Sequence, residues 1–388
     1  MTIQINSQFD GGNIEIVDIS DPSSIKLSIR ADASSNFLQW FYFSVSGVAG
    51  KECEISIVNA GQTSYARGWE DYDVVTSVDR HGWQRTPGRF DGKVLSWTVK
   101  TEADVVWFAY FAPYTLEQHA DLIAAAANAS GVEYEPLGQT HQGRGIDYLK
   151  VAALSTGSSN DPVNRARKQL WVIGRQHPGE PMAEWWMEGW IDRLLDEDDA
   201  TSRALRQLAD VHIVPNMNPD GTFLGHLRTN SVGVNLNREW AAPSLDRSPE
   251  VYFVKQKMTE TGIDIALDVH GDEALPYNFI AGSEGIPSWN EQRDMQLIAF
   301  KATWAALNPD FQTAHGYART PAGQANLSIC SSQLAETFGC LAMTLEMPFK
   351  DTADTPRALT GWSPERSMRL GASFVDMAYL ALSDRLLP

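Results

Sequence analysis

The stretch QLWVIGRQHPGEP, residues 169–181, joins two patterns within one short segment. Its first six residues are mostly apolar and predict a buried strand, and the aromatic-rich run MAEWWMEGW at 182–190 predicts a buried helix. Pro181 suits the first helical position, where its missing N–H costs nothing. The loop between the two elements carries His177 and Glu180, an imidazole and a carboxylate three positions apart.

This loop has two interpretations. His177 and Glu180 are two of the three protein ligands of a His₂Glu catalytic zinc site, which leaves its fourth position open for water. The simpler interpretation is that His177 is a turn histidine and that Glu180 is an acid favoured at a helix start by the helix dipole. The remaining chain decides between them by supplying a third ligand or failing to do so.

Overall composition narrows the classes of partner. The chain has 388 residues, which predicts two domains, and its 31 basic and 49 acidic residues give a net charge of −18. That charge argues against nucleic acid and anionic membranes as partners. No apolar run approaches the roughly 18 residues of a membrane span. The start MTIQIN lacks a secretory signal.

Three cysteines, Cys53, Cys330 and Cys340, form an odd and sparse set. This usage is typical of a reducing compartment and predicts a cytoplasmic protein. A pairing of Cys330 with Cys340 is the less favoured alternative there.

The first 113 residues are patterned as strands with almost no helical periodicity. Apolar and polar residues alternate with period two in several short runs, at 25–29, 41–45, 53–57 and 95–99. Turn residues separate these runs, which predicts an antiparallel β-sandwich without catalytic groups of its own. The pattern ends where Thr115 and Gln118 form a capping-box signature before a helix. We therefore expect domains at 1–114 and 115–388, packed together because no long flexible linker joins them.

Beyond residue 114, apolar runs alternate with helical stretches. This predicts an α/β domain with a mixed, largely parallel sheet and helices on both faces. Four runs are each followed by polar groups of catalytic type: 170–173, 211–215, 263–269 and 341–345. Ligands of such sheets bind outside the carboxyl ends of the strands, so these four ends are expected to converge on one crevice.

His270 and Glu346 end the third and fourth of these runs. His270 is the natural third metal ligand, with Asp268 nearby to orient its imidazole; alone, it would more often be a structural histidine. Glu346 is an acid among apolar neighbours, and burial would raise its pKa toward the range of a general base. The alternative for Glu346 is a buried pair with an arginine.

Arg228, Asn237 and Arg238 lie between the second and third runs. A guanidinium beside an amide suits bidentate capture of a substrate carboxylate. A second guanidinium near a metal could hold the oxyanion of a tetrahedral intermediate. Without the neighbouring motifs, these three residues would be interpreted as solvated surface groups.

Taken in order, His177-Pro178-Gly179-Glu180, Asn218-Pro219-Asp220-Gly221, Arg228, Asn237-Arg238, His270 and Thr344-Leu345-Glu346 resemble zinc carboxypeptidases of the funnelin type. The segments 38–43, 109–115, 143–147 and 235–240 are similar to the cytosolic carboxypeptidase branch. That branch carries a β-sandwich domain before the peptidase domain, so the resemblance covers nearly the whole chain.

The resemblance implies a role for each residue. His177, Glu180 and His270 would hold one zinc ion per chain, and Glu346 would be the general base. Arg228 would stabilise the oxyanion, while Asn237 and Arg238 would bind the terminal carboxylate of the substrate. Tyr317 is the candidate for the family's mobile substrate-binding tyrosine.

The implied substrate is the C-terminus of a peptide or protein. Branch membership suggests an acidic, glutamate-type residue there, for which Arg319, Lys350 and Arg357 are candidate basic partners. Asp272-Glu273 stands where many eukaryotic members have a second histidine, which weakens any transfer of side-chain preference.

Two other functions stay open at this point. One is zinc-dependent hydrolysis of small N-acyl amino acids, as in aspartoacylase-like relatives. The other is a non-enzymatic peptide-binding module, although no ligand or base is missing from the set. The sequence leaves room for an oligomer.

Overall fold

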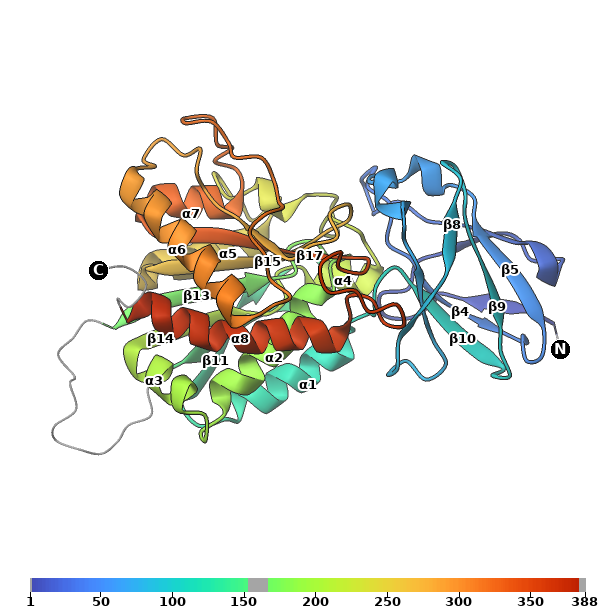
Figure 1. Ribbon diagram of the computed structural model, residues 1–388, viewed down its shortest axis with the longest axis horizontal. Helices are drawn as coiled ribbons and strands as arrows, with labels where there is room; N and C mark the ends of the chain where they lie inside the picture. The colour runs from blue at the N-terminus through green and yellow to red at the C-terminus, as the bar shows by residue number, and fades with distance from the viewer. Residues whose placement is uncertain (1, 153–166, 384–388) are drawn as a thin grey trace.

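The computed structural model describes residues 2–152 and 167–383 and shows two lobes side by side (Figure 1). Strands from the first 109 residues form one lobe, coloured blue to cyan, and the other lobe holds the long helices and remaining strands. No helix within the described ranges is long and apolar enough to cross a membrane. The predicted order, a β domain followed by an α/β domain, is confirmed.

The first lobe is a sandwich of two five-stranded sheets, ordered β1-β4-β10-β6-β7 and β2-β3-β5-β9-β8. Neighbouring strands are antiparallel except β3 and β5, which run parallel. The inward side chains of β5, Cys53, Ile55 and Ile57, are completely buried, as their alternation with polar residues predicts. The strands are β1 Gln4–Asn6, β2 Glu15–Asp18, β3 Ile25–Ser28, β4 Tyr42–Ser46, β5 Glu52–Ile57, β6 Val74–Ser77, β7 Gln84–Thr86, β8 Gly88–Phe90, β9 Leu95–Lys100 and β10 Val105–Ala109.

The second lobe contains a seven-stranded sheet, ordered β11-β12-β14-β13-β15-β17-β16. The four strands β14, β13, β15 and β17 are parallel, and the edge strands pair in the antiparallel sense. The four runs predicted to converge are therefore adjacent and point the same way. The strands are β11 Val132–Gln139, β12 Gly145–Val151, β13 Lys168–Gly174, β14 Ala209–Val214, β15 Ile265–Asp272, β16 Phe279–Ala281 and β17 Leu341–Pro348.

Helices cover both faces of this sheet, and alternate residues of β13 show how. Leu170 and Val172 pack with α2, α6 and α8, whereas Trp171 and Ile173 pack with α5 and α7. Thr115 caps α1 with the predicted capping box. The helices are α1 Leu116–Ala127, α2 Met182–Leu195, α3 Ala200–Leu208, α4 Pro219–Leu224, α5 Pro249–Thr261, α6 Glu291–Leu307, α7 Cys330–Phe338 and α8 Pro364–Leu382.

The two lobes share one apolar core. A single cluster of buried residues runs from the sandwich into the α2, α6 and α8 layer. At the junction the rings of Tyr110 and Phe349 stack with centroids 4.3 Å apart. The buried guanidinium of Arg85 donates to the carbonyl oxygens of Phe349 and Trp362. The lobes therefore pack as one body, as the absence of a long linker predicts.

Candidate active site

The carboxyl ends of the four parallel strands meet at the same edge of the sheet. His270 on β15 is the register partner of Glu346 on β17. The loop after β13 carries His177 and Glu180 beside them. The convergence expected from the sequence is thus present, because parallel neighbours in register bring their C-terminal ends together.

The loop after β13 is shaped by a residue with an unusual backbone. Arg175 has a φ of +57°, in the left-handed region that a residue other than glycine seldom adopts. Its guanidinium Nε donates to the carbonyl oxygen of Pro178 at 2.7 Å and its Nη1 donates to the Glu184 carboxylate. A Cβ at Gly179 would lie 2.7 Å from the carbonyl oxygen of Leu227, so this position has no room for a side chain.

The three expected metal ligands meet at one point. His177 Nδ1 lies 2.7 Å from Glu180 Oε1, His270 Nδ1 lies 2.8 Å from Glu180 Oε2, and the two Nδ1 atoms are 3.1 Å apart. All three side chains are buried. These are the donor types that zinc takes in catalytic sites, two imidazoles and one carboxylate.

Hydrogen bonds fix which imidazole nitrogen of each histidine faces this point. His270 Nε2 lies 2.9 Å from Asp268 Oδ2, and His177 Nε2 lies 3.2 Å from Asn235 Oδ1. The Asn235 oxygen also accepts the backbone N–H of Asn237, which identifies it as an acceptor. Both Nε2 atoms therefore carry a proton, and both Nδ1 atoms face Glu180, where a neutral imidazole would present a lone pair. Three acceptors so close together repel one another unless a cation lies among them, so the set fits a metal ion.

The pKa directions differ between the two histidines. Burial, with the nearby cation of Arg228, lowers the pKa of His177 to about 4, which keeps its imidazole neutral as ligation requires. Burial acts to lower the pKa of His270 too, but the carboxylates of Asp268 and Glu180 outweigh it and raise that pKa. Burial acts to raise the pKa of Glu180, yet the two imidazoles hold it below its ordinary value.

Gln176 supports the His270 side of the site and was not singled out from the sequence. Its Nε2 donates to Asp268 Oδ2 at 2.6 Å, and its Oε1 accepts from Trp240 Nε1 at 2.8 Å. The amide is completely buried. The sequence offered one signal for Gln176, since it is a polar residue directly before a candidate ligand. Its partner Trp240 lies 64 positions away, so the sequence did not show that the two meet.

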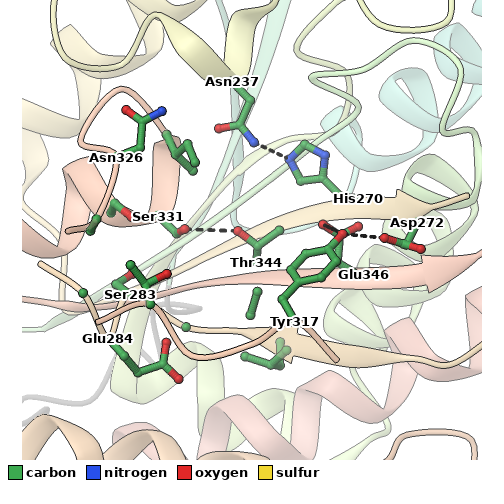
Figure 2. Close-up of a pocket in the computed structure, with 18 of the residues that line it drawn as sticks. Asn237, His270, Asp272, Ser283, Glu284, Tyr317, Asn326, Ser331, Thr344 and Glu346 are labelled. Atoms are coloured by element: carbon green, nitrogen blue, oxygen red, sulfur yellow. Dashed lines mark hydrogen bonds between the residues drawn. The ribbon is translucent and has the colours of Figure 1, made fainter. Parts of the chain in front are cut away.

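Glu346 lies beside the three candidate ligands with one oxygen unpartnered. Its Oε1 accepts from the Tyr317 hydroxyl at 3.2 Å, and its buried Oε2 has no hydrogen-bond partner (Figure 2). Burial raises its pKa well above the ordinary value; His270 opposes the shift, and the carboxylates of Glu180, Asp272 and Glu273 add to it. The Tyr317 hydroxyl also donates to Asp272 at 2.6 Å. The structure thus brings Tyr317 to the site beside Glu346.

Arg228, Asn237 and Arg238 line the same cleft. Arg228 Nη1 lies 4.0 Å from Glu180 Oε1. Asn237 Oδ1 accepts the backbone N–H of Cys330 at 2.8 Å, so its amide nitrogen is turned toward His270, 3.4 Å away. The neighbouring Arg238 guanidinium donates to the Asn237 carbonyl. All three residues thus bring donor groups to the cleft that holds the candidate ligands.

Each of the two lobes matches a known protein family. Residues 5–111 match the family described as cytosolic carboxypeptidase N-terminal domain, and residues 118–252 match zinc carboxypeptidase. A metallo-carboxypeptidase from Burkholderia cenocepacia is 42% identical, with 98% of this chain and 100% of its own covered and a TM-score of 0.94. The chain belongs to the zinc carboxypeptidase family.

Two further relatives agree with this assignment. A metallo-carboxypeptidase from Pseudomonas aeruginosa, solved with (2-guanidinoethylmercapto)succinic acid, is 45% identical, with 99% of this chain and 100% of its own covered and a TM-score of 0.93. Cytosolic carboxypeptidase 6 of Caenorhabditis elegans is 28% identical over 88% of this chain and 78% of its own length. This carboxypeptidase therefore shares the architecture of these relatives in both the β-sandwich and the α/β domain.

The cleft has a volume of about 740 Å³ and continues beyond the candidate catalytic groups. Figure 2 shows Ser283, Ser331 and Thr344 between the Glu346 end and Glu284. Thr344 Oγ1 donates to Ser331 Oγ at 3.1 Å. This part of the wall is made of small polar groups and ends at a carboxylate.

The three cations expected to receive an acidic substrate residue do not gather in this cleft. Arg319 lines it, but its guanidinium contacts the Asp294 carboxylate at 2.6 Å. Lys350 instead donates to the carbonyl oxygen of Glu70 in the sandwich at 2.6 Å, and Arg357 is not among the described residues lining the cleft. The expectation for Lys350 and Arg357 was wrong, because the chain after β17 turns toward the sandwich. Lys301 on α6 lines the cleft and was missed.

Proposed function

We propose that this enzyme hydrolyses the C-terminal peptide bond of peptides or proteins, with one zinc ion per chain held by His177, Glu180 and His270. The observation that carries the proposal is the orientation of both imidazoles, whose Nε2 atoms are engaged and whose Nδ1 atoms face Glu180. Zinc bound there would supply Lewis acidity toward the scissile carbonyl and lower the pKa of a water molecule.

Glu346 is the proposed general base. The unpartnered and buried Oε2 of Glu346 is free to accept the proton of the attacking water. Burial raises the pKa of this carboxyl from its ordinary value toward neutral pH, where a general base works best. The same carboxyl would then give the proton to the leaving amine. Tyr317, whose hydroxyl contacts Glu346, would bind the substrate at that side.

The cationic wall would bind and polarise the substrate. Arg228 is the proposed donor to the oxyanion that develops on the scissile carbonyl. Asn237 and Arg238 would hold the terminal carboxylate, since an amide and a guanidinium match its two oxygens. All three line the cleft that holds the candidate ligands.

The side-chain preference is the finer part of the proposal. Lys301 supports an acidic C-terminal residue, in place of the cations first expected. Glu284 lies in the same cleft and would favour a basic residue. The ligand of the Pseudomonas relative carries both a guanidino group and carboxyl groups, so both substrate classes belong in the test.

The test is a panel of peptides that differ only in the last residue, ending in Glu, Asp, Arg, Lys or Leu, analysed by mass spectrometry. We expect zinc-loaded protein to release one residue from at least one of them, and a Glu346→Gln protein to release about 10² to 10⁴ times more slowly. A panel that stays intact contradicts the peptidase proposal. Turnover of N-acetylaspartate in preference to every peptide would establish the amidohydrolase alternative.

We also propose that residues 1–114 and 115–388 are the two domains and that the enzyme acts in the cytoplasm. The first point is supported by the end of β10 at Ala109 and the start of α1 at Leu116. The second is supported by three buried cysteines that form no disulfide and by the cytosolic carboxypeptidase match of residues 5–111.

A further inference from the structure

The segment that carries Arg228 is enclosed at both ends by the backbone of the β-sandwich. It runs from Gly225 to Gly233, and both glycines have a positive φ. A Cβ at Gly225 would lie 2.7 Å from the carbonyl oxygen of Gly11, and one at Gly233 would lie 2.3 Å from that of Ser34. Only glycine permits this approach, because contacts under about 3 Å leave no room for a side chain.

Asp32 of the sandwich binds the middle of this segment. Its Oδ1 accepts the backbone N–H of Leu227 at 2.6 Å, and its Oδ2 accepts the backbone N–H groups of Arg228 and Thr229 at 2.8 and 2.9 Å. The Thr229 hydroxyl donates to Oδ2 at 3.0 Å. Asp32 is only 3% exposed. Four hydrogen bonds to one buried carboxylate fix the backbone on both sides of Arg228, and bonds to a charged acceptor are among the stronger ones.

Two aromatic rings of the sandwich hold the Arg228 side chain. The guanidinium carbon lies 5.7 Å from the centroid of the Phe37 ring and 5.4 Å from that of Tyr65. These distances are within the range of cation–π attraction. Tyr65 also lines the catalytic cleft. The guanidinium therefore packs against residues outside the α/β domain.

The same segment touches the candidate zinc loop. The carbonyl oxygen of Leu227 accepts the backbone N–H of Gly179 at 2.9 Å, next to Glu180. Asp32 thus holds the N–H side of Leu227 while the zinc loop holds its carbonyl side. A displacement of Asp32 would move the backbone N–H of Arg228, the proposed oxyanion donor, while the Gly179 hydrogen bond still holds Leu227.

We propose that Asp32 is a positioning residue that acts through Arg228, and that the β-sandwich thereby supplies part of the active site. This rests on the proposed function of Arg228 as the oxyanion donor. The competing explanation is that Asp32 only fastens the two lobes together. The two differ because a positioning residue loses its effect once Arg228 is gone, whereas an adhesive contact does not.

The test is a double-mutant cycle measured on a peptide that the enzyme cleaves. Arg228→Ala should lower kcat/KM by about 10² or more, as loss of an oxyanion donor does. Asp32→Ala should lower kcat about tenfold or more with a smaller change in KM, because an oxyanion donor out of place is lost mainly in the transition state. Adding Asp32→Ala to the Arg228→Ala protein should change kcat/KM less than about threefold, since the two residues act as one unit.

Three further variants keep the test informative. Asp32→Glu should restore part of the activity lost in Asp32→Ala, and Phe37→Leu should reproduce a weaker form of the loss without touching the carboxylate. Lys350→Met removes a different contact between the lobes, the hydrogen bond to Glu70, and should leave kcat unchanged. Zinc content and the melting temperature are measured for each protein.

The outcomes separate the two claims. Equal losses from Asp32→Ala in the presence and absence of Arg228, or equal losses from Lys350→Met, overturn the positioning role of Asp32. Unchanged turnover in Arg228→Ala overturns the proposed function of Arg228 itself. If Asp32→Ala does not fold, the cycle is run with Phe37→Leu, and additivity there overturns the inference.

Discussion

The two ends of the cleft differ in how firmly their polar groups are held. At the zinc end, His177, Glu180 and His270 each contact the others, and each imidazole has a second partner behind it. At the pocket end, Glu284 and Lys301 line the wall, half-buried, and their side chains make no hydrogen bond or ion pair to any described residue. The groups at the zinc end are therefore held by partners before a substrate arrives, whereas the two charged side chains at the pocket end are not.

This difference matches the demands of each end. Groups that stabilise a transition state act best when their orientation costs nothing at the moment of reaction. A side-chain pocket needs only to favour one residue over another by a free-energy difference of about 1 to 3 kcal/mol. We therefore expect substitutions to have large effects on turnover at the zinc end and small effects on preference at the pocket end.

Replacing Glu346 by Gln tests the zinc end most severely. We expect turnover to fall about 10² to 10⁴-fold with zinc content unchanged, since the amide keeps the shape and loses the base. Kinetic assays with metal analysis measure both quantities. Glu102→Gln, in an exposed part of the sandwich, is the matched control. Normal turnover in the Glu346 variant would show that another residue moves the proton.

Replacing Asp268 by Asn tests the layer behind the ligands. The loss of its charge beside His270 Nε2 should weaken zinc binding about 10 to 100-fold, because outer partners set the basicity of the imidazole. Competition with a chelator of known affinity gives the ratio. Asp192→Asn removes an exposed carboxylate from α2 and should leave zinc affinity as it was. Equal affinity for both variants would mean that the first layer alone holds the metal.

A buried network on the far side of the loop predicts a pH effect on stability. His119 contacts the carboxylates of Glu184 and Asp147. Burial alone would lower its pKa, but hydrogen bonds and charge from these two acids raise it to about 9. This group stabilises the fold fully below its ordinary pKa near 6.5, and the contribution disappears as pH rises through about 9. The melting temperature should therefore fall between pH 7 and pH 10, and His119→Asn should flatten that part of the curve.

The pocket end should give the smallest effects, opposite in sign for its two charges. Lys301→Gln should lower kcat/KM for peptides ending in Glu relative to those ending in Arg, and Glu284→Gln should do the reverse. A partly solvated charge pair contributes up to about 1 kcal/mol, which corresponds to a change of about fivefold. Glu291→Gln, in the first turn of α6, controls for net charge. A hundredfold change in the ratio of kcat/KM for Glu-ending and Arg-ending peptides, from either variant, would contradict the expectation that the pocket end has small effects.

Local sequence rules were enough to predict the strands of the central sheet and the candidate site residues at their carboxyl ends. The apolar runs were predicted as strands, and four parallel strands in register could bring their ends only to one edge. His177, Glu180, His270 and Glu346 followed from that geometry and from their chemistry. Tyr317 was chosen by elimination, and its contact with Glu346 depends on a loop whose path no local pattern gives.

The remaining parts depend on contacts between distant segments. Asp32 meets Arg228 across 196 positions, and only the docking of the two lobes brings them together. Lys350 and Arg357 were expected in the cleft as basic groups that could receive an acidic substrate residue. The turn after β17 directs Lys350 to the sandwich instead, while α6 brings Lys301 to the cleft from earlier in the chain. The charge of these residues and their positions in the sequence do not show which of them reaches the cleft.

The most direct test of the central claim is a zinc titration of the metal-free enzyme, followed by release of the C-terminal residue from a peptide. We expect no turnover without metal, and full recovery at one zinc ion per chain with no further gain. A His177→Ala protein should fail to recover at the same zinc concentration. Turnover that survives complete removal of zinc, or recovery in the His177 variant equal to that of the native chain, would contradict the account.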